Sequence, residues 1–150
     1  MANRRFAAAL LFSLGVLGFA AQADDTAEAL AFFKDYIARA DRFDPGLADL
    51  YAEDAAVRSK RIMPDGKSQT LTLSGAEWKA LIRQAMPIAK QRGDHNTFRN
   101  VSAKAVGKDV MVTAERYSHL KNYTSPFALL LSRDARGEWK IAAEITETRP

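Results

Sequence analysis

The last third of the chain constrains the fold most, because it predicts three consecutive β-strands. The strands are expected over residues 108–121, 125–133 and 138–148, and a short loop containing Gly137 joins the last two as a hairpin. Residues 126–131 are apolar on both faces, which predicts a central strand covered from both sides. A C-terminal antiparallel meander is therefore the frame that the rest of the chain has to complete.

The N-terminal segment has the three parts of a secretory signal peptide. Arg4 and Arg5 are followed by an apolar stretch over residues 6–20 and by a small-x-small site ending at Ala23. A membrane anchor is the alternative, but about 20 apolar residues are needed to span a bilayer and this stretch is shorter. We therefore expect cleavage after Ala23 and a periplasmic or secreted protein. The choice between the general and the twin-arginine export route stays open.

The remaining residues, 24–150, are enough for a single domain with its own core. Loss of Arg4 and Arg5 leaves 20 basic residues against 18 acidic ones, and no basic tract of the kind that follows nucleic-acid phosphates is present. We therefore expect no nucleic-acid partner and no membrane span after cleavage. The chain has no cysteine, so disulfides and thiol chemistry are excluded.

Three helices are predicted in the first half of this domain. The first spans residues 24–43, with Asp25 as its N-cap, and the second spans residues 45–51 after an Asp44 cap. Ser74 and Glu77 have the spacing of a capping box that begins the third helix. Pro87 lies inside the helical pattern, and it should kink this helix or end it.

The strand signals complete an α+β pattern. A hairpin over residues 55–63 and 68–73 precedes the third helix, and a strand over residues 98–106 follows it. The order is helix, helix, hairpin, helix and four antiparallel strands. This order predicts a curved antiparallel sheet wrapped around the three helices of the N-terminal half, which together form an open cone.

Three motifs in this order resemble the nuclear-transport-factor-2-like superfamily, which includes the ketosteroid isomerases and the SnoaL-like cyclases. They are DLYAEDAAV at residues 49–57, SGAE at residues 74–77 and RDARGEWKI at residues 133–141. The resemblance covers nearly all of residues 26–148. It implies a cone fold with a pocket between the helices and the concave face of the sheet.

The candidate ligand-binding residues for such a pocket are Tyr36, Tyr51, Trp78, Arg116, Tyr123 and Glu144. Glu144 is also the candidate catalytic residue, because its apolar neighbours predict either a raised pKa or a cationic partner. The alternative is that Glu144 lies on the opposite face of the sheet and pairs with Lys140 or Arg116 at an edge or a dimer contact.

The resemblance to ketosteroid isomerases is incomplete at the residues that perform their chemistry. It implies that Tyr36 occupies the position of their tyrosine oxyanion donor. The position of their general base falls near Ser59 and that of their acidic donor near Leu129. Serine does not abstract a proton from carbon unaided. Core packing, with the hydroxyl at the pocket wall, is therefore the favoured role for Tyr36.

Metal and cofactor chemistry is not predicted. His95 and His119 lack metal-ligand spacing, and no acidic cluster accompanies them in the sequence. Asp94 and His95 could act together as a base, as in some cyclase relatives, but they lie at the start of a loop and a solvated turn is the favoured explanation.

Three functions remain open at this stage. The first is an exported protein that binds a small, largely apolar ligand in the cone. The second is an isomerase, dehydratase or cyclase-like enzyme that uses Glu144 as general acid/base. The third is a homodimeric interaction domain whose outer sheet face carries Leu130, Trp139 and Ile141. The first two are separated by where Glu144 points and by whether it lies within about 3 Å of a tyrosine hydroxyl or of an empty polar cavity. The third is tested by whether the chain self-associates.

Overall fold

The computed structural model describes the backbone of residues 14–150 and the side chains of residues 21–150. The predicted signal peptide lies mostly outside the described residues, and its cleavage after Ala23 stays a prediction. No helix in the described part of the chain is long and apolar enough to cross a membrane.

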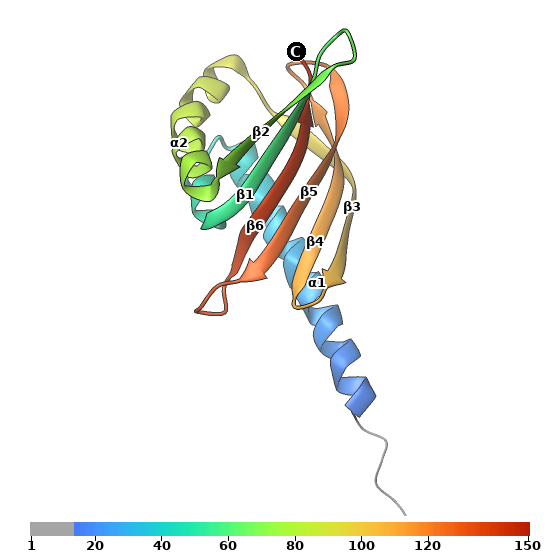
Figure 1. The fold of residues 1–150 in the computed structure, drawn as a ribbon. Helices are drawn as coiled ribbons and strands as arrows, with labels where there is room; N and C mark the ends of the chain where they lie inside the picture. The colour runs from blue at the N-terminus through green and yellow to red at the C-terminus, as the bar shows by residue number, and fades with distance from the viewer. Residues whose placement is uncertain (1–13) are drawn as a thin grey trace, which may run out of the picture.

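The fold is α+β, as predicted, with helices on one side of a six-stranded sheet (Figure 1). The helices are α1 (Leu14–Asp41), the 3-10 helix η1 (Pro45–Leu50) and α2 (Gly75–Arg92). The strands are β1 (Tyr51–Ile62), β2 (Ser68–Ser74), β3 (Asn96–Val106), β4 (Asp109–Ser118), β5 (Tyr123–Arg133) and β6 (Trp139–Thr148).

The sheet has the strand order β2-β1-β6-β5-β4-β3, and one of its pairs is parallel. Strands β1 and β6 run in the same direction, with Val57 opposite Glu144 and Ser59 opposite Thr146, while the other four pairs are antiparallel. The expectation of a wholly antiparallel sheet was therefore wrong for this pair. Hairpin signals report only neighbouring strands, whereas the β1–β6 contact joins the two ends of the domain.

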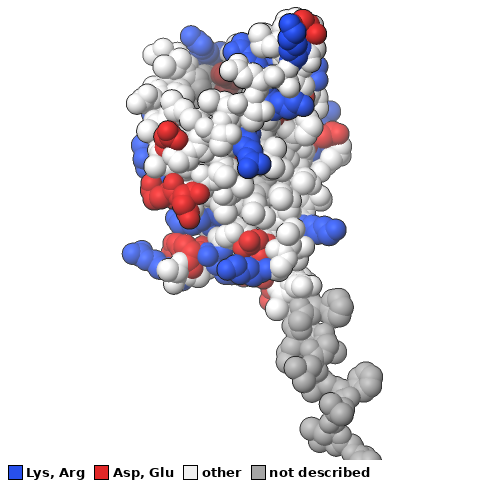
Figure 2. All heavy atoms as spheres, in the orientation of Figure 1, with Lys and Arg blue, Asp and Glu red and all other residues white. Residues whose placement is uncertain are grey.

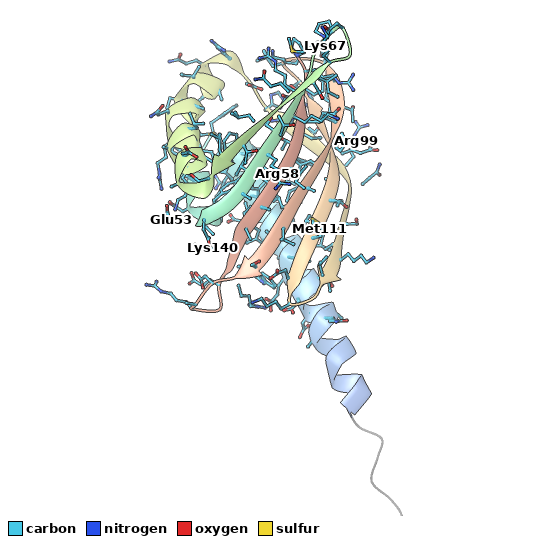
Figure 3. All side chains as sticks on the ribbon, in the orientation of Figure 1. Glu53, Arg58, Lys67, Arg99, Met111 and Lys140 are labelled. Carbon is cyan, nitrogen blue, oxygen red and sulfur yellow. The ribbon has the colours of Figure 1, made fainter. Side chains whose placement is uncertain are left out.

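Strand β5 is central, as predicted, but only one of its faces is covered. Phe127, Leu129 and Leu131 are buried under the helices, whereas Pro126 is exposed on the other face. Figure 3 shows the same outer face, with Arg58 of β1 turned away from the helices. The prediction of burial on both faces was wrong because all the helices pack on the concave side.

The outer face also lacks two of the three residues expected there. Ile141 is fully buried in the core, and Trp139 donates its indole N–H to Glu28 of α1. The β5–β6 register shifts between Leu130 and Leu131, so the simple alternation of faces along β6 does not hold. Leu130 remains as a half-buried residue of the outer side.

Two of the three helix caps that the sequence predicted are present in the structure. Asp44 caps η1 by accepting a bond from the Gly46 backbone, and Ser74 and Glu77 form the complete capping box of α2. The expected cap at Asp25 was wrong, because α1 already begins at Leu14 and passes through this residue. The Asp25 carboxylate instead pairs with Arg133 at 2.9 Å.

Two details of the helices refine the expectations. Of the two outcomes predicted for Pro87, a kink or an end, the structure contradicts the end, because α2 continues to Arg92; a proline removes one backbone hydrogen bond without forbidding further turns. The second helix is a single 3-10 segment, and Tyr51 is the first residue of β1 instead of the last of the helix.

Gly75 allows α2 to begin directly against the start of β1. A Cβ atom at this position would lie 1.9 Å from the Ala52 carbonyl oxygen and 2.9 Å from the Ala55 nitrogen, which leaves no room for any side chain. This close approach fixes the first turn of α2. It thereby places Trp78, one turn later, beside the concave face of the sheet.

Candidate functional site

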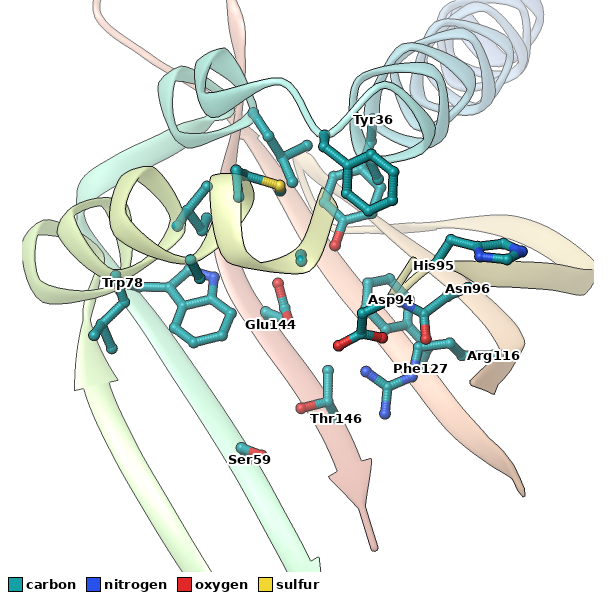
Figure 4. A pocket seen from close by; sticks show the side chains of 18 of the residues that line it. Tyr36, Ser59, Trp78, Asp94, His95, Asn96, Arg116, Phe127, Glu144 and Thr146 are labelled. Atoms are coloured by element: carbon teal, nitrogen blue, oxygen red, sulfur yellow. The ribbon is translucent and has the colours of Figure 1, made fainter. Parts of the chain in front are cut away.

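A cavity of about 300 Å³ lies between the helices and the concave face of the sheet (Figure 4). Its wall is largely apolar and is formed by α1, the segment after it, α2 and the inner faces of five strands. The apolar residues of α2 that line it include Trp78, Ile82, Met86 and Ala89. The helix therefore runs along the length of the cavity.

Strand β6 gives the cavity its polar wall and its length. Glu144, Thr146 and Thr148 all line it, because alternate residues of a strand share one face. At the usual rise for each residue of a strand, Thr148 lies about 13 Å from Glu144. We call the Tyr51–Glu144 part of the cavity the inner end, and the part around Thr148 and Arg116 the mouth.

The inner end is built on a buried hydrogen bond. The Tyr51 hydroxyl donates to Oε2 of Glu144, and these residues are only 2% and 3% exposed. Burial raises the pKa of Glu144 to about 7, although the bond from Tyr51 and the positive charge of Arg116 both lower it. The carboxyl group therefore exchanges its proton near neutral pH.

Both phenols at this end stay protonated. Burial raises the pKa of Tyr36 and of Tyr51 far above the usual range, and the charge of Glu144 raises both further. The Trp78 indole N–H lowers the pKa of Tyr51. This N–H does not meet the geometry of a hydrogen bond to Tyr51, and its nitrogen is buried without a partner among the described residues. The inner end is thus a compact group of neutral donors around one titratable carboxyl.

Tyr36 has both of the roles that were considered for it. Its ring stacks on Phe33 at 5.6 Å between centroids and packs against Phe127 at 5.8 Å, so it belongs to the aromatic core. It also lines the cavity, where Figure 4 shows it above Glu144. Core packing therefore does not remove this side chain from the site.

Arg116 of β4 lies at the mouth. Its Nη2 donates to the Glu147 carbonyl at 2.7 Å and, more weakly, to the Ser125 hydroxyl at 3.3 Å and the Tyr123 hydroxyl at 3.4 Å. Its Nε is buried without a partner. All these partners are neutral, so the guanidinium charge faces no carboxylate within ion-pair distance among the described residues.

The structure brings five of the six candidate residues to this cavity. Tyr36, Tyr51, Trp78, Arg116 and Glu144 line it, whereas Tyr123 lines a second cavity at the mouth. The alternative placement of Glu144 on the outer face was wrong. Lys140, the partner considered for it there, donates to the Asp49 carbonyl instead.

Some wall residues were missed by sequence reasoning. Phe43 lines the cavity from a left-handed backbone conformation, with a φ of 55°, directly after α1. A bulky residue with positive φ gives no signal in a single sequence. Phe98 was also missed, because only the pairing of β3 with β4 places it beside Arg116. Thr146 was missed although it lies two residues from Glu144 in β6 and so shares its face.

The two histidines stack on each other, with ring centroids 4.2 Å apart, and Nδ1 of His95 lies 3.0 Å from the Gly93 carbonyl oxygen. His95 and Asp94 line the mouth of the cavity. Within residues that the structure describes, no group of three histidine, cysteine or acidic residues could hold a metal ion.

The fold and its cavity define a nuclear-transport-factor-2-like cone. The solved structures similar to this chain include a nuclear-transport-factor-2-like protein with a cystatin-like fold from Novosphingobium aromaticivorans, with a TM-score of 0.60 and 16% identity over 91% of this chain and 90% of that one. No family model and no curated protein matches the sequence.

Two other similar structures carry chemical information of their own. One is a protein from Catenulispora acidiphila in complex with S-DNPA, with a TM-score of 0.54 and 14% identity over 81% of this chain and 90% of that one. The other is a putative ketosteroid isomerase from Shewanella frigidimarina, with a TM-score of 0.55 and 18% identity over 76% and 89%. At these identities the likeness establishes the fold alone.

Proposed function

We propose that the protein binds a small, largely apolar molecule in this cavity and holds one polar group of it at the inner end. The observation that carries the proposal is a cavity of about 300 Å³ whose apolar wall ends at the buried Tyr51–Glu144 pair. Ligand pockets generally combine a concave apolar wall with a few polar groups that fix orientation.

The inner end suits an uncharged hydroxyl or carbonyl group. Because the pKa of Glu144 is about 7, its carboxyl can donate or accept a hydrogen bond near neutral pH. The similar structure from Catenulispora acidiphila was solved with a small molecule, so a cone of this kind accommodates a ligand.

The test is a fluorescence titration of the full chain with N-phenyl-1-naphthylamine, an uncharged dye that brightens in apolar sites. Ala89 lies on the cavity wall, and Ala89→Trp should fill part of the cavity and weaken dye binding at least about tenfold. The matched control is Ala80→Trp, on an exposed position of the same helix outside the cavity.

The control variant also accounts for dye bound elsewhere on the chain. Wild type and Ala80→Trp should bind the dye equally, with saturation at one dye for each chain. Absence of saturable binding, or equal binding by all three proteins, would contradict the proposal.

A second candidate function is acid–base catalysis on a bound ketone, and one observation favours it. A carboxyl with a pKa of about 7 at the wall of an apolar cavity matches the requirement for a general base near neutral pH. Glu144 also pairs in register with Leu129, so its carboxyl lies one strand away from the position where the resemblance places an acidic donor.

This candidate is tested by hydrogen exchange into 2-tetralone in D₂O, followed by mass spectrometry. Enolisation removes a proton from the carbon next to the carbonyl and returns a deuteron from solvent. Wild type should accelerate the exchange, and Glu144→Gln should reduce the rate to that of buffer. A rate unaffected by Glu144→Gln would leave binding as the function.

Export of the protein is part of the same proposal. Its support is the pattern of Arg4 and Arg5, an apolar stretch and a small-x-small site before Asp24. Mass spectrometry of the protein from its native cells should find an N-terminus at Asp24. An intact N-terminal segment would contradict export by a cleaved signal.

A further inference from the structure

A second cavity, of about 350 Å³, opens directly beyond the mouth of the first. The two share Asp94, Asn96, Arg116 and Thr148 in their walls, so they are adjoining parts of one depression. They differ in character, because the first is mainly apolar and the second is lined mostly by polar and charged side chains.

The second cavity is strongly cationic. Its wall contains Arg61, Arg116, Lys121 and Arg149 against the single carboxylate of Asp94. Arg149 pairs with Glu147 at 3.5 Å, but none of the other three cations forms an ion pair with a described residue. Figure 2 shows several basic side chains on the outer face at the end of the molecule that carries the β1–β2 turn, and others at the opposite end.

These cations come from three separate strands and loops. Arg61 ends β1 opposite Thr148, Arg116 belongs to β4, and Lys121 lies in the turn between β4 and β5. Their convergence at one opening places positive charge where a bound molecule would leave the apolar cavity. Cations that surround an opening attract and orient anionic ligands.

We infer that the ligand is an amphipathic anion: an apolar body inside the first cavity and one oxyanion group, a carboxylate or a phosphate ester, at the cationic mouth. The inference rests on the proposed binding function and adds the class of ligand. The distance along β6 from Glu144 to Thr148, about 13 Å, sets the length of the apolar body.

The charges also fix the orientation. Glu144 carries negative charge above its pKa of about 7, so an anion at the inner end would meet a buried like charge. At the mouth the same anion meets Arg116, whose present partners are all neutral oxygens. The apolar body enters first and the oxyanion stays outside.

The experiment compares three competitors that share one apolar body: 4-(1-naphthyl)butanoate, 4-(1-naphthyl)butan-1-ol and the monophosphate ester of that alcohol. Each displaces N-phenyl-1-naphthylamine from the full chain at pH 8 and low salt. At least one of the two anions should bind about tenfold more tightly than the alcohol. The advantage should shrink as salt is added, because exposed charges are screened.

Matched variants test whether the cations at the mouth cause the tighter binding of the anions. Arg61→Gln combined with Lys121→Gln removes two mouth cations, both exposed, that bond to no other described side chain. The control, Lys60→Gln combined with Lys104→Gln, removes the same charge from exposed positions outside both cavities. The first pair should abolish most of the anion advantage and leave alcohol binding unchanged, while the control should change neither.

The outcomes separate the two proposals. Equal affinity for the alcohol and both anions, or an anion advantage as large without Arg61 and Lys121 as in wild type, would overturn the inference while binding of the apolar body still stands. Failure of the alcohol to displace the dye would instead overturn the proposed function itself. The tighter of the two anions identifies the oxyanion that the mouth accepts.

Discussion

The two ends of the cavity differ in the burial of their ionisable groups, because the inner end holds a buried pair and the mouth carries exposed cations. At the inner end, Tyr51 and Glu144 are almost fully buried, bond to each other and are neutral below pH 7. At the mouth, Arg61 and Lys121 are exposed and carry charges that no described residue neutralises. Substitutions of the buried pair at the inner end should therefore change stability, whereas substitutions of these exposed cations at the mouth should change only ligand binding.

The largest effect is expected from alanine at the two ends of α2. Gly75→Ala places a Cβ 1.9 Å from the Ala52 carbonyl oxygen beside the inner end, and it should lower the free energy of unfolding by roughly 3 kcal/mol or prevent folding. Gly93→Ala, at the mouth end, meets no atom within 4 Å. Gly93→Ala should lower the free energy of unfolding only by the strain of alanine at a positive φ, about 1 kcal/mol.

Urea unfolding of both variants gives these values. Equal costs for the two substitutions would show that α2 does not depend on close contact with β1.

Glu144 should make stability fall as pH rises toward 7. Its folded pKa of about 7 lies above the ordinary value of 4.5, so between these values the folded chain keeps a proton that the unfolded chain has lost. Relative to Glu144→Gln, wild type should lose on the order of 3 kcal/mol of unfolding free energy between pH 4.5 and pH 8.

Chemical unfolding of both proteins at the two pH values measures this difference, because contributions from other groups cancel between them. If the difference in unfolding free energy between wild type and Glu144→Gln did not depend on pH, Glu144 would not be the titrating group that distinguishes the inner end from the mouth.

Tyr51→Phe should have a smaller effect and sharpen the account of the buried pair. Removal of the hydroxyl takes away the hydrogen bond that lowers the pKa of Glu144, so that pKa should rise further above 7. At pH 8 the variant should lose about 1 to 3 kcal/mol of unfolding free energy, since a buried carboxylate loses its donor. Carbon-13 NMR of the glutamate carboxyl groups follows the titration, and an unchanged or lowered pKa would contradict the hydrogen bond.

The smallest effect on stability is expected at the mouth. Arg61→Gln combined with Lys121→Gln should change the free energy of unfolding by no more than about 0.5 kcal/mol, because both side chains are exposed and neither bonds to a described residue. A thermal melt in parallel with the Lys60→Gln and Lys104→Gln control measures it. A clear loss of stability in the mouth variant alone would show that these cations support the fold.

Much of the fold was predictable because its signals are local. The Asp44 cap, the Ser74–Glu77 capping box and the turn around Gly137 each depend on residues a few positions apart, and the structure contains all three. Strand β5 was placed at the centre of the sheet by its apolar run alone. These features need no knowledge of what lies elsewhere in the chain.

The site was less predictable because its geometry is not local. That Glu144 faces the concave side depends on the β1–β6 register, and that Tyr51 reaches it depends on two segments 93 residues apart. The cationic mouth combines Arg61, Arg116 and Lys121, which show no clustering as a group in the sequence. The sequence nominated Tyr51, Glu144 and Arg116 but not Arg61 or Lys121, and only the fold shows that these residues line adjoining cavities.

The two tryptophans of the chain allow the central claim to be tested in one measurement. The Trp78 indole N–H lies at the inner end of the cavity, whereas that of Trp139 bonds to Glu28 outside it. In a ¹H–¹⁵N NMR spectrum, addition of 2-naphthol should shift the Trp78 indole signal and leave the Trp139 signal in place. A Trp78 signal that does not respond while 2-naphthol binds elsewhere would contradict the proposed site.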